Sequence, residues 1–287
     1  MTLGLDPLVI ALVLLAALLH ASWNAILKTS PDRLTTTGIM NFTGFAVGVA
    51  LLPFIASPAR ASWVFLLLSM VIHFGYYAFL LGSYRFGDLS QVYPLARGCG
   101  PLIVAFLSPW LIGERLEPVQ LAGVVLLCVG VLSLAFNRLR FGELLDWKPA
   151  SMALLTGVTI AAYTIADALG VRRSGSPGGY IAWLFILDGV TMAAIAAWMR
   201  GRSFLPALRS NWWTGGLCGL LSMAAYGIVI WCYGLGAIAP IAALRETSVV
   251  MAAAIGALLL REPFGRWRIL AASFCAVGIV AINLGRG

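Results

Sequence analysis

The sequence predicts an all-α polytopic membrane protein with ten transmembrane helices, built as two inverted five-helix repeats around a central cavity. Three observations predict this class: the composition, the succession of long apolar runs, and an internal repeat of residue spacing. Of the 287 residues, 61% are apolar and only 10% are charged, whereas a soluble domain carries roughly 25% charged residues. Most of this chain is therefore expected to be surrounded by lipid.

About ten apolar runs approach the roughly 20 residues that a helix needs to cross the hydrocarbon core. The runs are continuous rather than alternating, which predicts helices and excludes a β-barrel. The first run has no basic region before it and is expected to remain as a span, not to act as a signal peptide. The expected spans are residues 8–27, 34–56, 63–84, 89–112, 119–136, 150–169, 180–198, 212–233, 238–260 and 267–284.

The breaks between the runs exclude other classes of protein. The longest, 137–149 and 199–211, hold about 13 residues each and are too short for a soluble catalytic domain. The net charge of +8 does not indicate nucleic-acid binding, because the basic residues lie at helix ends and form no single stripe. All five cysteines fall inside apolar runs, without the His spacing of a metal site, so neither a metal nor a cofactor is expected.

The distribution of basic residues predicts the orientation in a cell (inner) membrane. The loops after the odd-numbered spans carry about 12 Lys and Arg residues and the opposite loops about 5, which places the first set in the cytoplasm. With an even number of spans, both termini are then expected on the non-cytoplasmic side.

An internal repeat relates the third to fifth spans to the eighth to tenth. The spacing from Tyr to Tyr, from Arg to Glu and from Glu to Gly is identical in two sets of residues: Tyr77, Tyr84, Arg97, Glu114 and Gly130 in the first, and Tyr226, Tyr233, Arg245, Glu262 and Gly278 in the second. The expected halves are residues 1–140 and 141–287. Since five is odd, the second half enters the membrane from the opposite side, and inverted repeats are typical of transporters with a solute site near the midplane. A duplicated scaffold without transport is the alternative.

The repeat also resembles a known family. The resemblance rests on the segment His20-Ala21-Ser22-Trp23-Asn24, the segment Ala161 to Asp167 at the matching place in the second half, the pairs Gly113-Glu114 and Arg261-Glu262, and a Gly-rich fifth helix. This pattern is similar to the EamA-type branch of the drug/metabolite transporter superfamily. The resemblance covers nearly the whole chain and implies ten helices, a central cavity and movement of metabolites, often outward; it does not imply an enzyme.

Four charged residues lie well inside the expected spans: Arg97, Asp188, Arg245 and Glu246. Such residues are expensive in lipid and often mark a solute or proton path. Because Arg97 and Arg245 are equivalent in the repeat, they are expected to meet centrally, where two guanidinium groups suit a carboxylate or phosphate. The alternative is structural, with Arg245 paired to Glu246 or Asp188 and no solute bound.

Proton coupling has three candidates, namely Asp188, Glu246 and His73. Asp188 and Glu246 could instead receive a substrate ammonium group, and a histidine in an apolar run is more often simply hydrogen-bonded. Asp167 is expected near a helix end, in an interfacial salt bridge or a helix-end contact.

Aromatic residues are candidates for a cavity wall, because their faces bind amines and their hydroxyl groups orient polar ligands. The candidates are Tyr77, Tyr226, Trp23, Tyr76, Tyr93 and Tyr163. Helix packing is the alternative for the tyrosine stripe. Pro94 and Pro101 flank Arg97 and predict a bent or broken fourth helix, with Pro240 as a weaker counterpart before Arg245.

The function expected from these features is secondary-active transport of a small polar metabolite, an amino acid or other organic anion or zwitterion, by alternating access. Partners are then the solute, protons or a counter-substrate, and lipid, in a monomer or homodimer. The alternatives are an exporter of cationic amines or drugs and a flippase for a lipid-linked substrate. No phosphate-binding loop appears, so direct use of ATP by this chain is not expected.

Overall fold

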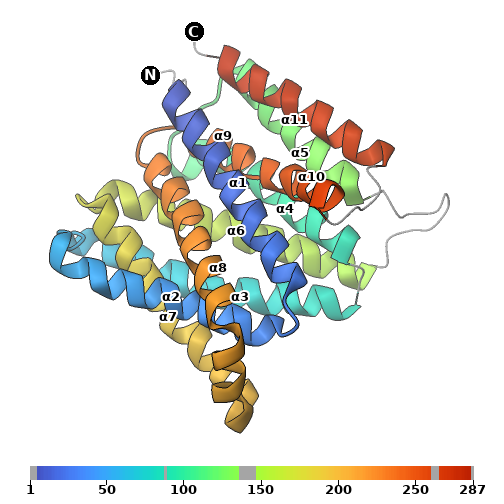
Figure 1. Ribbon diagram of the computed structural model, residues 1–287. Coiled ribbons are helices and arrows are strands. Elements are labelled where there is room, and N and C mark those ends of the chain that lie inside the picture. The colour runs from blue at the N-terminus through green and yellow to red at the C-terminus, as the bar shows by residue number, and fades with distance from the viewer. Residues whose placement is uncertain (1–4, 87–88, 136–146, 260–264, 286–287) are drawn as a thin grey trace.

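The computed structural model describes residues 5–86, 89–135, 147–259 and 265–285, and it is helical throughout (Figure 1). The first half contains α1 (Pro7–Thr29), α2 (Arg33–Leu51) with the short helix η1 (Leu52–Phe54), α3 (Arg60–Phe86), α4 (Leu89–Leu111) and α5 (Pro118–Ser133). The second contains α6 (Trp147–Arg173), α7 (Pro177–Arg200), η3 (Gly201–Ser203), α8 (Phe204–Tyr233), α9 (Ile238–Arg245), α10 (Thr247–Leu259) and α11 (Arg266–Leu284).

Ten spans result, because only Glu246 separates α9 from α10 and the two form one crossing. Within the described chain, seven helical segments are long and apolar enough to cross a membrane, and the segments Arg60–Tyr76 and Pro118–Ser133 are shorter and apolar. The remaining crossing is α4, which carries Arg97. The predicted all-helical class with ten helices is confirmed.

Local sequence signals fix where several helices begin. The side chains of Asp6 and Ser176 accept hydrogen bonds from the backbone N–H groups of Leu8 and Gly179, at 2.7 and 3.2 Å, and proline follows each cap. Proline is tolerated in the first turn, where its missing N–H would have no partner within the helix. The chain therefore reverses direction between spans within a few residues.

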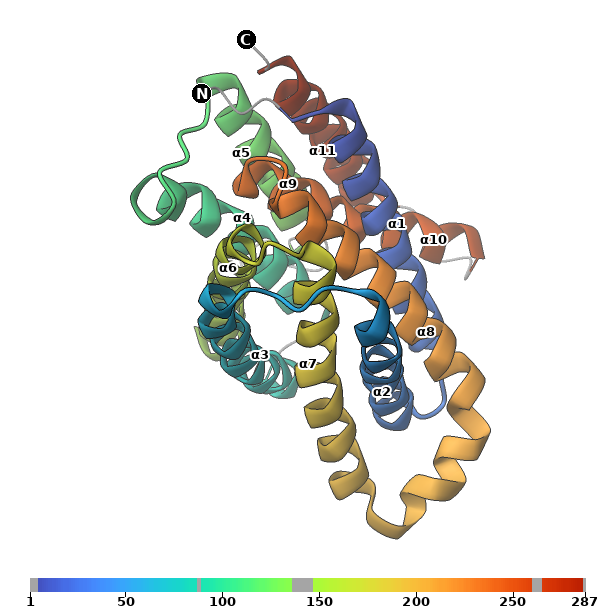
Figure 2. The same ribbon diagram turned by 90° about the vertical axis from the view of Figure 1, so that its left-hand side faces the viewer.

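The packing of the helices follows the repeat. Helix α3 packs on α6 as α8 packs on α1, and α4 packs on α6 as α9 and α10 pack on α1. Three contacts join equivalent helices of the two halves directly: α2 with α7, α4 with α9, and α5 with α11, the last pair lying side by side in Figures 1 and 2. Exchanging the halves thus maps these contacts onto one another, which is consistent with an inverted repeat, although α2 contacts α8 more extensively than α7 contacts α3.

Glycines allow α5 and α11 to approach closely. A Cβ atom on Gly123 would lie 2.8 Å from the carbonyl oxygen of Gly278, and a Cβ atom on Gly278 would lie 2.8 Å from that of Gly123. The equivalent pair under the repeat is Gly130 with Ala271, where a Cβ atom on Gly130 would lie 3.0 Å from the Ala271 carbonyl oxygen. Small residues are the usual means of close helix packing in lipid.

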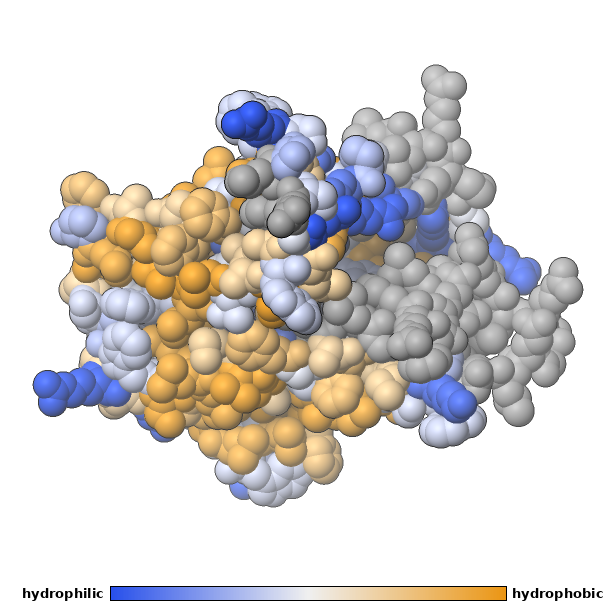
Figure 3. Space-filling model, turned by 90° about the horizontal axis from the view of Figure 1, so that it is seen from below, coloured by the Kyte–Doolittle hydropathy of each residue, from blue (hydrophilic) through white to orange (hydrophobic). Residues whose placement is uncertain are grey.

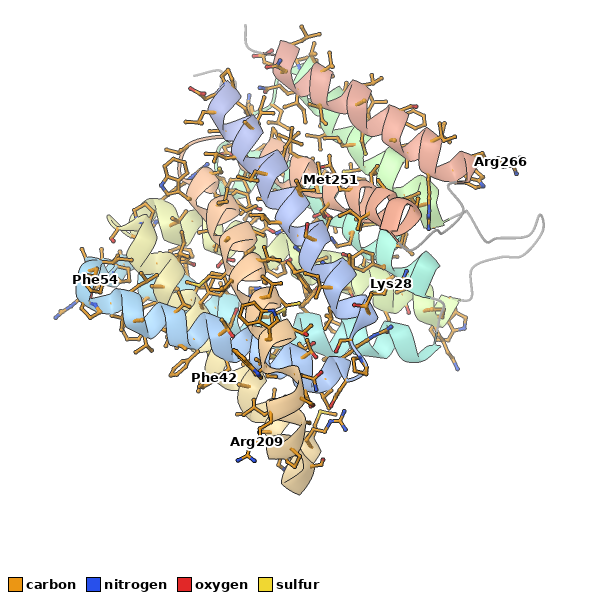
Figure 4. The ribbon with its side chains drawn as sticks, viewed as in Figure 1. Lys28, Phe42, Phe54, Arg209, Met251 and Arg266 are labelled. Carbon is orange, nitrogen blue, oxygen red and sulfur yellow. The ribbon has the colours of Figure 1, made fainter. Side chains whose placement is uncertain are left out.

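The outer surface is apolar and its ends are charged. Large side chains face outward, for example Phe54 and Trp198, both 83% exposed, and Figure 3 shows a broad hydrophobic surface with hydrophilic residues toward its edges. Lys28, Arg209 and Arg266 lie at the ends of their helices away from the two termini (Figure 4). The start of α1 and the end of α11 lie at one end of the bundle (Figure 1), as an even number of spans requires.

Candidate functional site

A buried cluster of three charged side chains lies where the two halves meet. Nε of Arg97, on α4, lies 2.6 Å from Oε2 of Glu246. Nη2 of Arg245, the last residue of α9, lies 3.2 Å from Oε1 of the same carboxylate. Arg97 and Arg245 are each 4% exposed and Glu246 is fully buried. The expectation that the two repeat-equivalent arginines meet in the centre agrees with this geometry, and one glutamate joins them.

The ninth span is interrupted at this cluster. The N–H of Glu246 donates to the carbonyl of Ala243, three residues back, at 3.0 Å, and the hydroxyl of Thr247 donates to the carbonyl of Leu244 at 2.7 Å. These contacts satisfy backbone groups at a point where the regular helix stops, as lipid requires. Arg245 and Glu246 meet although they are adjacent in sequence, since Nε and Nη2 of Arg245 lie 3.3 and 3.2 Å from Oε1 of Glu246.

The interruption is not where the prolines indicate. The prolines predicted a bent or broken fourth helix, and the break is not present, because α4 continues through Pro94 and Pro101. The break occurs in the ninth span at Glu246, six residues after Pro240. A proline removes one hydrogen bond, and neighbouring helices in a membrane bundle can support a helix across that gap. The charged residues, and not a proline, mark the broken span.

Tyrosine rings lie beside the charged cluster. The guanidinium carbon of Arg97 lies 5.9 Å from the centre of the Tyr93 ring, and that of Arg245 lies 6.0 Å from the rings of both Tyr163 and Tyr226. These distances allow cation–π contact. Three of the aromatic residues expected from sequence therefore border the arginines.

Two further candidate aromatic residues, Tyr76 and Trp23, contact other aromatic rings. Tyr76 contacts Tyr163 edge to face, with ring centres 5.9 Å apart, and His73 stacks on Tyr163 at 4.3 Å. Trp23 contacts His20, with ring centres 5.0 Å apart, and its buried indole N–H has no hydrogen-bond partner in the described part of the chain. The structure thus extends the tyrosine wall through Tyr76 and places Trp23 next to His20.

Some repeat residues fall outside the described structure. These are Arg261 and Glu262, the side chains of Tyr77 and Tyr84, and the expected boundary between residues 140 and 141.

A second polar cluster is centred on Asp167 of α6. Its Oδ1 accepts a hydrogen bond from the hydroxyl of Tyr180 at 3.1 Å, and its Oδ2 accepts one from Tyr226 at 2.5 Å. Asp167 is fully buried, and its partners are tyrosine hydroxyl groups in place of the expected salt bridge or helix-end contact. The sixth helix extends to Arg173, beyond the expected end of the span at residue 169, so Asp167 lies farther from the helix end than the sequence indicated.

His73 and Asp188 form a third polar contact next to this cluster. His73 Nδ1 lies 2.9 Å from the carbonyl oxygen of Ser69 and 3.6 Å from Oδ2 of Asp188. Since a carbonyl only accepts, Nδ1 carries a hydrogen and donates to Ser69. His73 is therefore hydrogen-bonded, as the simpler interpretation of its sequence context predicted, and Arg245 pairs with Glu246 in place of Asp188.

Two hollows on the outer surface are separate from the charged cluster. One of about 220 Å³ is lined by α2 and α8, including Trp212 and Trp213, and one of about 490 Å³ lies between α1, α7 and α8, near Trp231. None of the charged side chains lines either hollow. In this structure the charged cluster itself is closed to solvent.

Comparison with known proteins identifies the family to which the chain belongs. Residues 7–136 and 147–284 each match the EamA-like transporter family. The chain belongs to the EamA-like transporter family. It is a multi-pass membrane protein of a transporter family and not of an enzyme family.

The fold of this EamA-like transporter is also found among solved structures. One, described only as the crystal structure of a protein, superposes with a TM-score of 0.77 at 20% sequence identity, covering 96% of each chain. At that identity the likeness concerns the fold alone. The sequence matches no curated protein.

In the EamA-like transporter, an ion pair joins the two halves at the end of the bundle where the termini lie. Oε1 of Glu114, after α4, lies 2.6 Å from Nη2 of Arg172 of α6, and Oε2 accepts from the N–H of Ile238, the first residue of α9, at 2.9 Å. Arg172 also donates to the carbonyls of Tyr233 and Gly236 at 2.8 and 2.7 Å. These contacts join both halves. The sequence indicated Glu114 as a repeat position and as part of the Gly113-Glu114 pair, but residue spacing does not show which residues of other loops it contacts.

At the opposite end, Arg200 pairs with Asp32, the N-cap of α2. Partial burial disfavours the charged form of Asp32, but hydrogen bonds from Thr35 and Arg200 outweigh that effect and hold the pKa of this carboxyl below its usual range. Arg200 is the last residue of α7 and Asp32 precedes α2, so this pair also joins the two halves.

Proposed function

We propose that this EamA-like transporter carries a small metabolite with a carboxylate group, an amino acid or a related organic anion or zwitterion, by secondary-active alternating access. The observation that carries the proposal is the sharing of one buried carboxylate by two repeat-equivalent guanidinium groups. Proposed substrate-binding residues are Arg97, Arg245, Glu246, Tyr93, Tyr163, Tyr226, Tyr76, Tyr77 and Trp23.

The charge balance of the cluster favours an anionic group. Two arginines and one glutamate leave one positive charge in excess in a buried place, which is costly without a counter-ion. Nη2 of Arg97 is buried and has no hydrogen-bond partner among the described residues. A solute carboxylate could accept from this free N–H, as guanidinium groups commonly bind carboxylates through paired hydrogen bonds.

Glu246 then acts as an internal stand-in for the solute. In the closed structure its carboxylate pairs with the guanidinium groups of both arginines. When a solute carboxylate takes one guanidinium, Glu246 keeps the other and becomes available to an ammonium group. A zwitterionic amino acid satisfies both charges at once.

The burial of the cluster requires movement for access. With the three residues at most 4% exposed, solute reaches them only after the halves separate on one side. The pairs Glu114–Arg172 and Asp32–Arg200 join helices of different halves at opposite ends. We infer that these ends open alternately, as inverted repeats permit.

Orientation and partners complete the proposal. Both termini face the non-cytoplasmic side of a cell (inner) membrane, residues 1–140 and 141–287 form the two inverted halves, and the protein is a monomer or homodimer. Protons or a counter-substrate drive the movement, with Asp188, Glu246 and His73 as the coupling groups indicated by sequence.

A second candidate function is export of cationic amines. The tyrosine faces within 6.0 Å of the arginines could bind an amine in the same way, and Glu246 could pair with its charge. The excess positive charge of the cluster opposes this alternative. A flippase would instead respond to lipid-linked head groups.

Counterflow into liposomes tests the proposal. A thermal-shift screen of amino acids and organic acids first selects the probes, since a ligand stabilises the folded protein by mass action; leucine, glutamate and the amine tyramine are included. Wild-type protein should exchange the acids, whereas Arg97→Ala and Arg245→Ala should lose exchange. Arg209→Ala, which changes an exposed arginine at one end of α8, is the matched control.

Two results would count against the proposal. Full exchange by both arginine variants would remove the arginines from the site. Competition by tyramine, but by neither acid, would favour the amine exporter.

A further inference from the structure

Asp167 differs from the other buried carboxylates of this protein. Glu246 and Glu114 each pair with an arginine, but within the described part of the chain no lysine or arginine forms an ion pair with Asp167, which is fully buried. An ionised carboxylate without a counter-ion is expensive at bilayer depth, so such a group is retained where a proton can bind it.

We propose that Asp167 is a proton-binding site and that its occupancy is coupled to the charged cluster through Tyr226. The inference rests on the transport function proposed above, and it assigns the coupling proton to a residue other than Asp188, Glu246 or His73. The ligand is a proton taken from water on one side of the membrane and released to water on the other.

The hydrogen bonds around Asp167 depend on its protonation state. Both of its oxygens accept, one from Tyr180 and one from Tyr226, and the Ser69 side chain is a further hydrogen-bonding neighbour, so the contacts as they stand fit the ionised form. A proton bound to one oxygen turns that oxygen into a donor. The hydroxyl hydrogen of the facing tyrosine must then turn away, and the tyrosine accepts instead.

The two tyrosines differ in how far they can respond. The Tyr180 ring lies over Gly170, where an added Cβ atom would be 2.4 Å from ring atoms, and this close packing holds Tyr180 in place. The Tyr226 ring instead borders the guanidinium group of Arg245 at 6.0 Å, and Arg245 holds Glu246. Rearrangement at Tyr226 therefore reaches the proposed substrate site directly.

The groups that surround Asp167 leave a route for the proton. The titratable neighbours are His73 from α3, Tyr180 and Asp188 from α7, and Tyr226 and Tyr233 from α8. The charged residues of α4 and α9, namely Arg97, Arg245 and Glu246, are paired with one another. The Asp188 side chain is 20% exposed and that of His73 is 11% exposed, so a proton would reach Asp167 through these partly exposed groups.

Infrared difference spectroscopy of the purified protein tests the site without any substrate. Acidification should produce C=O bands of protonated carboxylic acids in wild type, and one component of them should disappear in Asp167→Asn and remain in Asp188→Asn. A difference spectrum that is unchanged in Asp167→Asn, or no pH-dependent band in wild type, would overturn the proposal.

A second pair of variants keeps the test valid if Asp167→Asn does not fold. Tyr180→Phe and Tyr226→Phe each remove a hydrogen-bond partner from the carboxyl group, so the C=O band should move to higher frequency. An unchanged band in both variants would show that the protonated group is elsewhere.

Transport then separates this inference from the proposed function. With leucine as the probe, Asp167→Asn should keep counterflow at equal pH and lose acceleration by a pH gradient, while the control Asp6→Asn, at the exposed N-cap of α1, keeps both. Absence of counterflow in wild type would contradict the proposed function alone. Counterflow with undiminished acceleration in Asp167→Asn, or acceleration by a sodium gradient in place of a pH gradient, would contradict the proton site alone.

Discussion

Replacing Glu246 by glutamine removes the only charge that balances two buried guanidinium groups in the central cluster. The glutamate is fully buried and lies 2.6 Å from Arg97 and 3.2 Å from Arg245. Removing one partner of a buried ion pair costs about 3–5 kcal/mol, because the remaining charge stays buried without compensation. The equilibrium constant for unfolding should rise on the order of 10² to 10⁴-fold.

Unfolding of the purified protein in detergent, followed by tryptophan fluorescence, measures this change. Asp6→Asn is the matched control, since it removes a carboxylate at the exposed N-cap of α1, where asparagine caps equally well. A Glu246→Gln variant within about 0.5 kcal/mol of wild type, the usual range for a neutral surface substitution, would refute the role given to this carboxylate.

Three further predictions concern the helix contacts and the two ends of the bundle. Gly278→Ala should destabilise the protein by about 1–3 kcal/mol through overpacking, whereas Gly216→Ala should be nearly neutral because nothing lies within 4 Å of the added atom; equal effects in a thermal-unfolding assay would contradict the packing. Glu114→Gln should lower the free energy of unfolding by about 2 kcal/mol, because the charged contacts of this carboxylate are lost. An unchanged unfolding curve would contradict a stabilising role of the Glu114–Arg172 pair. Asp32 has a lowered pKa, so its stabilisation is present at neutral pH and disappears as the pH falls through that lowered value; the stability difference between wild type and Asp32→Asn should close in acid, and a constant difference would refute this.

The arginine pair could be predicted from the sequence because equivalent residues of an inverted repeat lie at matching depths in the membrane. Equal spacing from Arg97 to Gly130 and from Arg245 to Gly278 places the arginines at the same depth in opposite directions. Glu246 has Gly98 as its counterpart under the same spacing. The sequence therefore indicated the symmetric part of the site, but not that a single glutamate would join its two sides.

The remaining parts of the site depend on tertiary structure. Tyr180 and Tyr226 reach Asp167 from two other helices, and no spacing within α6 indicates that contact. The position of the break in the ninth span was also hidden, because prolines are the visible local signal while the break here accompanies buried charges.

The most direct test of the central claim is the affinity for leucine of wild type, Arg97→Lys, Arg245→Lys and the double variant. Lysine keeps the charge but loses the paired hydrogen bonds of the guanidinium group. If both arginines hold one carboxylate, each single variant binds more weakly, and the double variant loses less than the sum of the two free-energy changes. Affinities unchanged from wild type, or strictly additive losses, would contradict a shared site.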